Sequence, residues 1–143
     1  MIQRSVLILT FIMMGTAVAA QERLLWSELE SISFEEVYDE PTATWVQVPQ
    51  WTEEQRNSWS GSYVLVTGYA IVLDPVDQVY ALSAFPFSSC FFCGAAGPES
   101  VMEILFESPQ KLLTDDVVTV IGQIKLNTTP ENLPFTLVNA RLK

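Results

Sequence analysis

The sequence predicts a mainly β protein whose C-terminal part forms a small five-stranded barrel. Segments rich in β-branched and aromatic residues recur at 63–73, 79–85, 101–107, 117–126 and 136–142, with turn-forming residues between them. Gly68 stands in the middle of the first and longest segment, which predicts a bulge or a sharp bend there. A bent first strand can pair with both halves of a barrel and leaves few free edges. The five-stranded Greek-key barrel known as the OB-fold meets these demands, and a small open β-sandwich is the alternative.

The last three segments alternate between apolar and polar residues, as expected of strands with one face on a core. In 101–107 the alternation assigns the odd-numbered Glu103 and Glu107 to solvent. The residues expected on one inward face of each segment are Met102, Ile104 and Phe106, then Val118, Val120, Ile124 and Leu126, then Val138, Ala140 and Leu142.

Residues 1–20 have the features of a secretory signal peptide. Arg4 is their only charged residue, an apolar run follows at 6–14, and Ala17-Val18-Ala19-Ala20 fits a cleavage site. The apolar run is shorter than the roughly 20 residues of a transmembrane helix. We therefore expect a periplasmic or secreted protein with no integral membrane span after cleavage, and an uncleaved membrane anchor is the alternative.

Residues 21–60 are expected to form an N-terminal arm with short helices, placed before a barrel at 61–143. Leu25, Leu29 and Ile32 have helical spacing, and Thr52 with Gln55 has the form of a capping box, so a second helix should begin at Glu53. The tryptophans of residues 44–59 are expected to fasten the arm to the barrel, with a stacking platform for bases or sugars as the alternative. These tryptophans are Trp45, Trp51 and Trp59.

The chain is strongly acidic, with a net charge of −10. The first 20 residues hold one basic and no acidic residue, so their removal changes the net charge from −10 to −11. Such a surface repels phosphate backbones, which argues against a nucleic-acid partner. It suits a solvated surface, a partner with a basic face, or cations.

Cys90-Phe91-Phe92-Cys93-Gly94 holds both cysteines of a chain that has no histidine. In an oxidising compartment the two thiols would favour a small structural disulfide. A metal site is the second hypothesis: with two sulfurs and no imidazole it requires two-coordinate Cu(I), or Zn(II) with ligands from carboxylates or another chain. A redox site is the third, although nothing nearby in the sequence would lower a thiol pKa. Haem attachment requires histidine where Gly94 stands.

The residues around the cysteines predict a shaped, aromatic loop over 86–99. Gly94, Gly97 and Pro98 favour a fixed backbone, and Glu99 is expected either to cap the loop or to lie in solvent. Phe85 and the three phenylalanines closer to the cysteines could close one barrel end, or they could form an exposed docking surface for another protein. The residues of that docking surface would be Phe87, Phe91 and Phe92.

Other motifs give little support for an enzyme. Without histidine, neither a Ser-His-Asp triad nor a Cys-His pair can form, and Gly-x-Ser-x-Gly is absent from the sequence. Asn127-Thr128-Thr129 matches an N-glycosylation acceptor, which matters only in a eukaryotic secretory pathway.

Several of these segments together resemble a family of uncharacterised bacterial secreted or periplasmic proteins with an OB-like barrel. The resemblance rests on residues 68–73 and 80–83, on Cys90-Phe91-Phe92-Cys93-Gly94 followed by Gly97-Pro98-Glu99-Ser100, and on 120–127 and 135–141 as closing strands. It implies an OB-like barrel in the cell envelope. Some relatives accompany envelope transporters, including metal-uptake systems, and the resemblance carries no catalytic residue.

The function expected from the sequence is therefore non-enzymatic. We expect a periplasmic binding or accessory protein that uses residues 86–99 to recognise an envelope protein or transporter component. The alternatives are a protein that binds or delivers Cu(I) or Zn(II) through Cys90 and Cys93, and a thiol–disulfide oxidoreductase.

Overall fold

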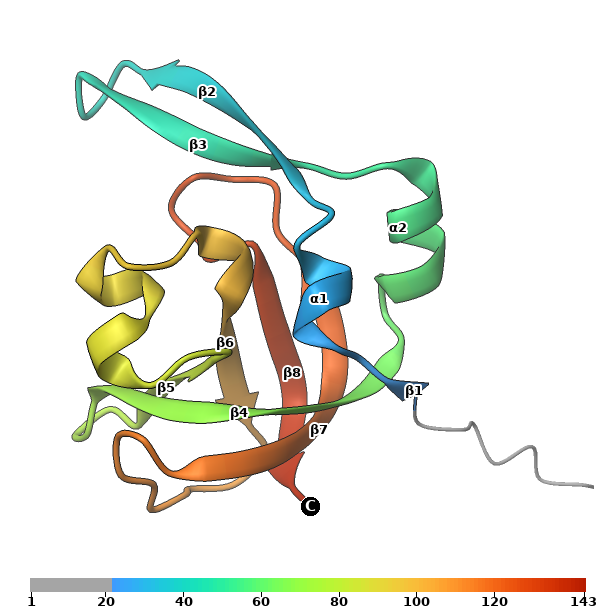
Figure 1. Ribbon diagram of the computed structural model, residues 1–143, viewed down its shortest axis with the longest axis vertical. Helices are drawn as coiled ribbons and strands as arrows, with labels where there is room; N and C mark the ends of the chain where they lie inside the picture. Colours follow the sequence, from blue (N-terminus) through green and yellow to red (C-terminus); the bar gives the residue numbers. More distant parts are fainter. Residues whose placement is uncertain (1–21) are drawn as a thin grey trace, which may run out of the picture.

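A computed structural model describes residues 22–143 and shows a β-barrel with an N-terminal arm (Figure 1). The predicted signal peptide, residues 1–20, lies outside the described residues. The strands are β1 (Glu22–Arg23), β2 (Ser33–Asp39), β3 (Thr44–Gln50), β4 (Tyr63–Asp74), β5 (Val79–Ser83), β6 (Val101–Phe106), β7 (Val117–Leu126) and β8 (Phe135–Leu142). The helices are α1 (Trp26–Leu29) and α2 (Glu53–Trp59), with single 3₁₀ turns η1 (Phe87–Ser89), η2 (Phe91–Cys93) and η3 (Pro98–Ser100).

Five strands close into a barrel in the order β4-β5-β6-β8-β7, and β7 pairs back to β4. Strands β6 and β8 are parallel, whereas the other barrel pairs are antiparallel. Counted from β4, this order is first, second, third, fifth, fourth, which is the arrangement of an OB-like barrel. The predicted fold class is confirmed.

The closure depends on β4, which is 12 residues long and changes partner halfway. Its residues 63–69 pair with β7, and its residues 69–74 pair with β5. Gly68 lies at this change of partner. The whole strand curves along the barrel wall (Figure 1). A Cβ added at Gly68 would lie 2.5 Å from the carbonyl oxygen of Ser83, so only glycine fits without a shift. The strand is thus curved as predicted, along its whole length rather than only at Gly68 (Figure 1).

The inward face of β8 differs from the prediction at two positions, while Ala140 is buried as expected. Phe135, Leu137 and Ala140 are buried, while Val138 is only half-buried and Leu142 is exposed. Asn139 has φ +51°, and the pairing of β8 with both neighbours shifts register at this point. This bulge changes which residues face inward, because one extra residue reverses the alternation.

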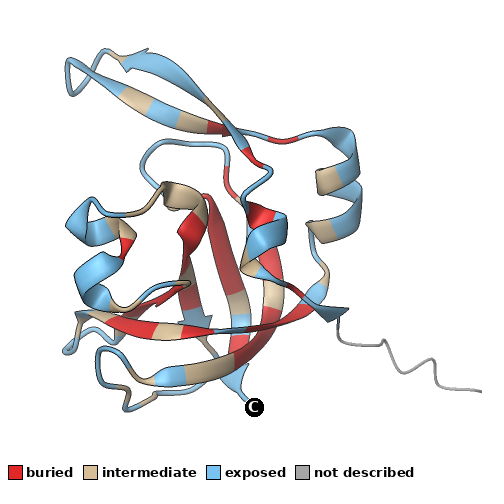
Figure 2. Ribbon diagram, in the orientation of Figure 1, coloured by how far each residue is buried: buried red, intermediate tan, exposed pale blue. Residues whose placement is uncertain are grey.

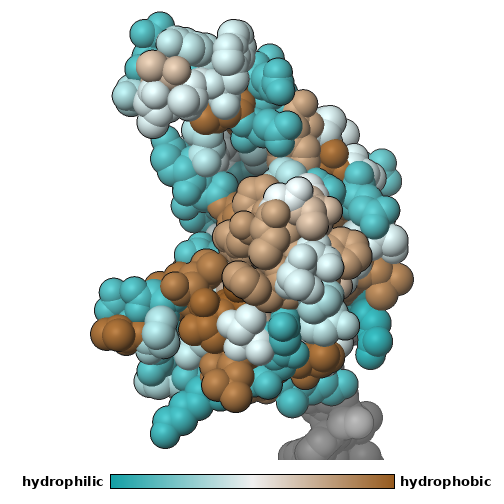
Figure 3. Space-filling view, turned by 60° about the vertical axis from the view of Figure 1, so that its left-hand side comes forward, coloured by the Kyte–Doolittle hydropathy of each residue, from teal (hydrophilic) through white to brown (hydrophobic). Residues whose placement is uncertain are grey.

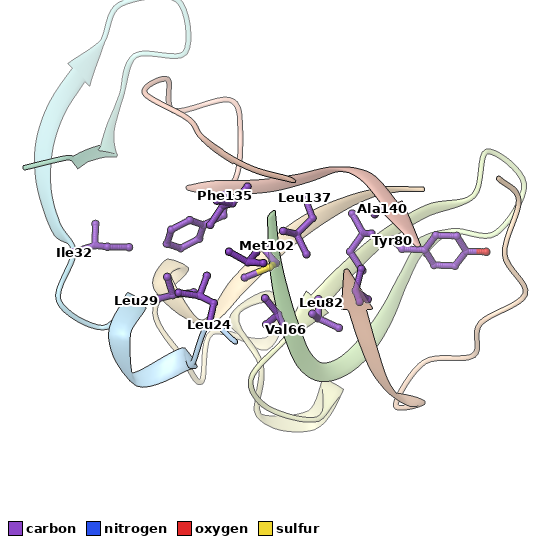
Figure 4. Close-up of a cluster of buried hydrophobic side chains, with 14 of the residues drawn as sticks. Leu24, Leu29, Ile32, Val66, Tyr80, Leu82, Met102, Phe135, Leu137 and Ala140 are labelled. Carbon is purple, nitrogen blue, oxygen red and sulfur yellow. The ribbon is translucent and has the colours of Figure 1, made fainter. Parts of the chain in front are cut away.

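The barrel core runs from the arm to the far end of the barrel (Figures 2 and 4). Leu29 of α1 is fully buried and packs at one end, whereas Tyr80 lies toward the other end. As predicted, Met102, Ile104 and Phe106 contribute to this core. Burying a leucine such as Leu29 contributes about 2 kcal/mol, so even a four-residue helix is firmly held.

The arm contains more than the predicted short helices. Helix α1 ends at Leu29 and does not extend to Ile32, although Ile32 is also buried. Helix α2 begins at Glu53 with the expected capping box, in which Thr52 accepts a hydrogen bond from the Gln55 amide. Between the two helices, β2 and β3 form an antiparallel hairpin that was not predicted. Figure 1 shows the hairpin extending over one side of the barrel.

Two of the three tryptophans predicted to fasten the arm do so, and Trp26 adds a further attachment, because its indole N–H donates to the backbone oxygen of Thr67 in β4 at 2.8 Å. The Trp51 indole N–H donates to the backbone oxygen of Asn127 at 2.7 Å, and both Trp51 and Trp59 pack near Phe135. Trp45, on the hairpin, is 69% exposed. No helix within residues 22–143 is long and apolar enough to cross a membrane.

Candidate functional site

The cysteine loop (residues 86–99) connects β5 to β6 and is fixed at its base. The amide of Ala84 donates to the carbonyl of Ser100 at 2.9 Å, which closes the loop. The amide of Phe87 donates to the Asp115 carboxylate at 2.7 Å, which joins the loop to the segment between β6 and β7. Three 3₁₀ turns then organise the loop, so its side chains have defined positions.

The two thiols of this loop differ in exposure. Cys90 is fully buried, Cys93 is exposed, and no disulfide joins them in the structure. The Cys93 S–H donates to the carbonyl oxygen of Phe87 at 2.8 Å. Desolvation of the Cys93 sulfur raises its pKa, and the nearby Cys90 raises it further through its charge and through a hydrogen bond. The two sulfurs are therefore neighbours, and Cys93 is predominantly a thiol at neutral pH.

Two of the predicted loop-shaping residues, Gly94 and Gly97, lie between the 3₁₀ turns, and the other two, Pro98 and Glu99, belong to η3. Gly94 has φ +73° and ends η2, and its amide donates to the Phe91 carbonyl at 2.8 Å. Pro98 is the first residue of η3, which follows Gly97 directly. Glu99 lies against Gly97, and both line a separate hollow of about 470 Å³ beside Trp26.

The phenylalanines between the cysteines are held against the barrel wall. Phe91 is half-buried and packs on a small cluster formed by Ile71, Ala81 and Val101. Phe92 contacts Phe91 edge-on at a centroid distance of 5.6 Å and is 40% exposed. The two rings are therefore fixed from below, and Phe92 remains accessible to a ligand.

A groove of about 540 Å³ lies between the hairpin, the cysteine loop and the loop between β7 and β8. Figure 3 shows a hollow between the hairpin, at the top, and the apolar surface below it. The hairpin contributes Phe34, Val46, Gln47 and Pro49, the cysteine loop contributes Phe91, Phe92 and Pro98, and the third wall is formed by residues 130–134. Leu73 of β4 and Glu103 of β6 complete the lining, which is mostly apolar.

The structure brings together some of the sequence-predicted residues and separates others. Phe91, Phe92 and Pro98 lie in the groove, whereas Phe87 is 46% exposed outside it. Neither cysteine lines the groove, although the two residues between them do. The predicted docking surface is therefore divided between the groove and the outer side of the cysteine loop.

Glu103 is the functional candidate that the sequence did not reveal. Alternation assigned it to solvent, but it is half-buried in the groove. The Thr136 hydroxyl donates to Glu103 Oε2 at 3.1 Å, and the Asn127 amide donates to the Thr136 oxygen at 2.9 Å. The same amide donates to the Leu133 carbonyl at 2.6 Å. This network orients the carboxylate from below.

Asn127 is consequently a structural residue. Its side chain is buried, and its amide nitrogen takes part in the two hydrogen bonds to Leu133 and Thr136. In this fold, attachment of a glycan at the acceptor sequence would disrupt both bonds and the adjoining loop.

Metal-ligating residues are sparse in the part of the chain that the structure describes. Residues 22–143 contain no group of three or more His, Cys, Asp or Glu side chains placed to hold one ion. Cys90 and Cys93 therefore offer two sulfurs and no third ligand from this range, which leaves linear two-coordinate binding as the available geometry.

No protein-family model, curated protein or solved structure matched this chain. The barrel and the groove accordingly rest on the sequence and the structure, and the resemblance to secreted envelope proteins remains a prediction.

Proposed function

We propose that this protein is a non-enzymatic binding or accessory protein of the cell envelope that holds a partner protein in the groove. The observation that carries the proposal is the apolar lining of the groove, which includes the accessible ring of Phe92. Exposed apolar hollows of this size are characteristic of binding sites.

The position of the groove on the barrel also supports binding. Its floor includes Glu103 of β6, the third barrel strand, and one wall is the loop between the fourth and fifth strands. OB-folds bind extended polymers over the face of their second and third strands, beside this loop. The acidic charge of the chain makes a nucleic-acid occupant unfavourable.

Site-directed photocrosslinking in the producing cells tests this proposal. A photoreactive phenylalanine analogue at position 92 is expected to crosslink to one discrete envelope protein. The matched control carries the analogue at Leu113, which is 73% exposed outside the groove. Equal crosslinking from both positions, or none from position 92, would contradict the proposal.

A second candidate function, binding or delivery of a soft metal ion, is favoured by the adjacent sulfurs of Cys90 and Cys93. The two-ligand geometry suits Cu(I), and metal binding would displace the proton that the raised pKa of Cys93 retains. Native mass spectrometry of the reduced protein should then show one Cu(I), lost in the C90S/C93S double variant. Equal copper content in both proteins would exclude this site.

The third hypothesis, a thiol–disulfide oxidoreductase, has less support. Such an enzyme requires an accessible cysteine whose pKa lies below its ordinary value. The accessible cysteine is Cys93, whose pKa is raised.

A further inference from the structure

The basic residues of the chain are absent from the segments that form the groove. Residues 24–55 and 57–110 contain no Lys or Arg, and the groove loop 130–134 contains none. The groove lining includes two carboxylates, Glu103 and Glu131. The two carboxylates would therefore attract a positively charged occupant, and no lysine or arginine of the groove walls would repel it.

Glu103 is built to receive that charge. Its Oε2 accepts from Thr136, which the buried Asn127 holds in place, so Oε1 is left for a ligand. The apolar surroundings, with Phe91 and Leu133 packed on the adjacent cluster, reduce the screening of a charge pair by water. A carboxylate fixed in such a setting forms strong, short hydrogen bonds with an ammonium or guanidinium group.

One face of the hairpin carries further apolar, aromatic and acidic side chains beyond the groove. Opposite residues of an antiparallel pair lie on one face, so Phe34 and Pro49 share their face with Glu36 and Gln47 and then with Tyr38 and Trp45. Tyr38 and Trp45 contact each other edge-on at 5.6 Å, and both are exposed. Exposed aromatic rings beside a carboxylate suit apolar side chains and cations alike.

The same hairpin favours a polypeptide as the occupant. Within the described residues, β3 pairs only with β2, so its other edge presents unpaired backbone groups. Three of the four hairpin residues in the groove belong to β3. An extended peptide can pair with such an edge while its side chains enter adjacent pockets.

We propose that the groove recognises an extended segment of a partner protein in which apolar residues flank a lysine or arginine, with Glu103 binding the cationic group. This inference rests on the proposed function and specifies the partner's chemistry. The hydrophobic side chains occupy the space beside Phe92 and Leu133, and the cation reaches Glu103 on the floor.

Fluorescence anisotropy with synthetic peptides tests the inference. The probes are labelled, capped nonapeptides whose central residue is Arg, Lys, Gln or Glu, with Leu and Phe on both sides. The purified protein should bind the Arg and Lys peptides about tenfold more tightly than the Gln peptide, and the Glu peptide weakest. Equal binding of all four peptides, or none up to about 1 mM, would overturn the inference.

The variant Glu103→Gln identifies the anchor. It should lose about tenfold in affinity for the Arg peptide and little for the Gln peptide, because only the charge is removed. The matched control is Glu107→Gln, an exposed position directly after the same strand and outside the groove. Thermal unfolding of both variants checks that the fold is intact, and equal losses in the two variants would overturn the role of Glu103.

The outcome separates this inference from the proposed function. If a partner crosslinks to position 92 and binds the Glu103→Gln variant normally, the groove is the binding site but Glu103 does not bind a cationic group. If no protein crosslinks to position 92, the groove is not the binding site, and the proposed function is contradicted as well.

Discussion

Gly68 shows how one residue determines the closure of the barrel. It lies where β4 leaves β7 and begins to pair with β5. At this point the backbone of Ser83 and the side chains of Leu82 and Trp26 approach so closely that no Cβ fits. The bend of β4, the approach of β5 and the docking of α1 therefore meet at a residue that has no side chain.

Replacing Gly68 with alanine should accordingly destabilise the protein by about 3 kcal/mol, because the backbone of β5 must move. The comparison is Gly94→Ala, where no atom lies within 4 Å of the added Cβ and only the φ of +73° is unfavourable. That change should cost about 1 kcal/mol. Chemical denaturation of both variants measures the difference, and a smaller loss for Gly68→Ala would contradict the close approach at the bend.

The two cysteines illustrate how a motif depends on its surroundings. Cys90 belongs to the buried interior of the loop, whereas Cys93 is at the surface with a raised pKa and a carbonyl acceptor. Their neighbours Phe91 and Phe92 form part of the groove wall. The segment that first suggested redox or metal chemistry thus also supports a binding surface.

Among the elements, the hairpin is the one least supported by the rest of the molecule. Most of its side chains are exposed, and the described residues give it no third strand. A two-stranded sheet is marginally stable by itself. Its attachment depends on Phe34, which packs against the core, and on the buried Pro49.

Amide hydrogen exchange should therefore divide the β-structure into two classes. The amides of β2 and β3 should exchange orders of magnitude faster than those of β4 and β7, which are paired on both sides or lie in the barrel wall. Mass spectrometry of proteolytic fragments measures the difference. Equal protection of hairpin and barrel would show that the hairpin is a rigid part of the core.

The barrel strands were predictable from the sequence, whereas the hairpin was not, for a physical reason. Strands that cover a core carry a clear apolar face, and the segments of β4 to β8 do so. In β2, Glu35, Glu36 and Val37 follow one another, so neither face is consistently apolar. In β8, Val138 was mispredicted because a bulge at Asn139 leaves no distinct sequence signal, whereas Ala140 is buried as expected and Leu142 is exposed at the end of the strand.

At the scale of the whole molecule, the groove joins segments that are far apart in the chain. Its walls come from residues 34–49, 91–98 and 130–134, with Glu103 between them. Only the middle segment was a candidate from sequence, because its cysteines and phenylalanines stand together. The groove and the role of Glu103 depend on tertiary structure, since alternation alone assigns this glutamate to solvent.

The charged residues are also distributed unevenly with respect to the groove. The net charge of −10 is unevenly distributed, since long segments around the groove have no basic residue. Such an arrangement attracts cationic partners over the range of a Debye length and weakens as salt is added. The acidic balance that argued against nucleic acid in the sequence is matched in the groove, whose lining includes Glu103 and Glu131 and no lysine or arginine.

Crosslinking from all three groove walls is the most direct measurement of the binding site. The photoreactive residue is placed in turn at Gln47 of the hairpin, Phe92 of the cysteine loop and Asn132 of the third wall, with Leu113 as the position outside. A single partner protein captured from the three walls, and not from Leu113, is the expected result. Different partners from the three walls, or no capture at any of them, would contradict a common groove.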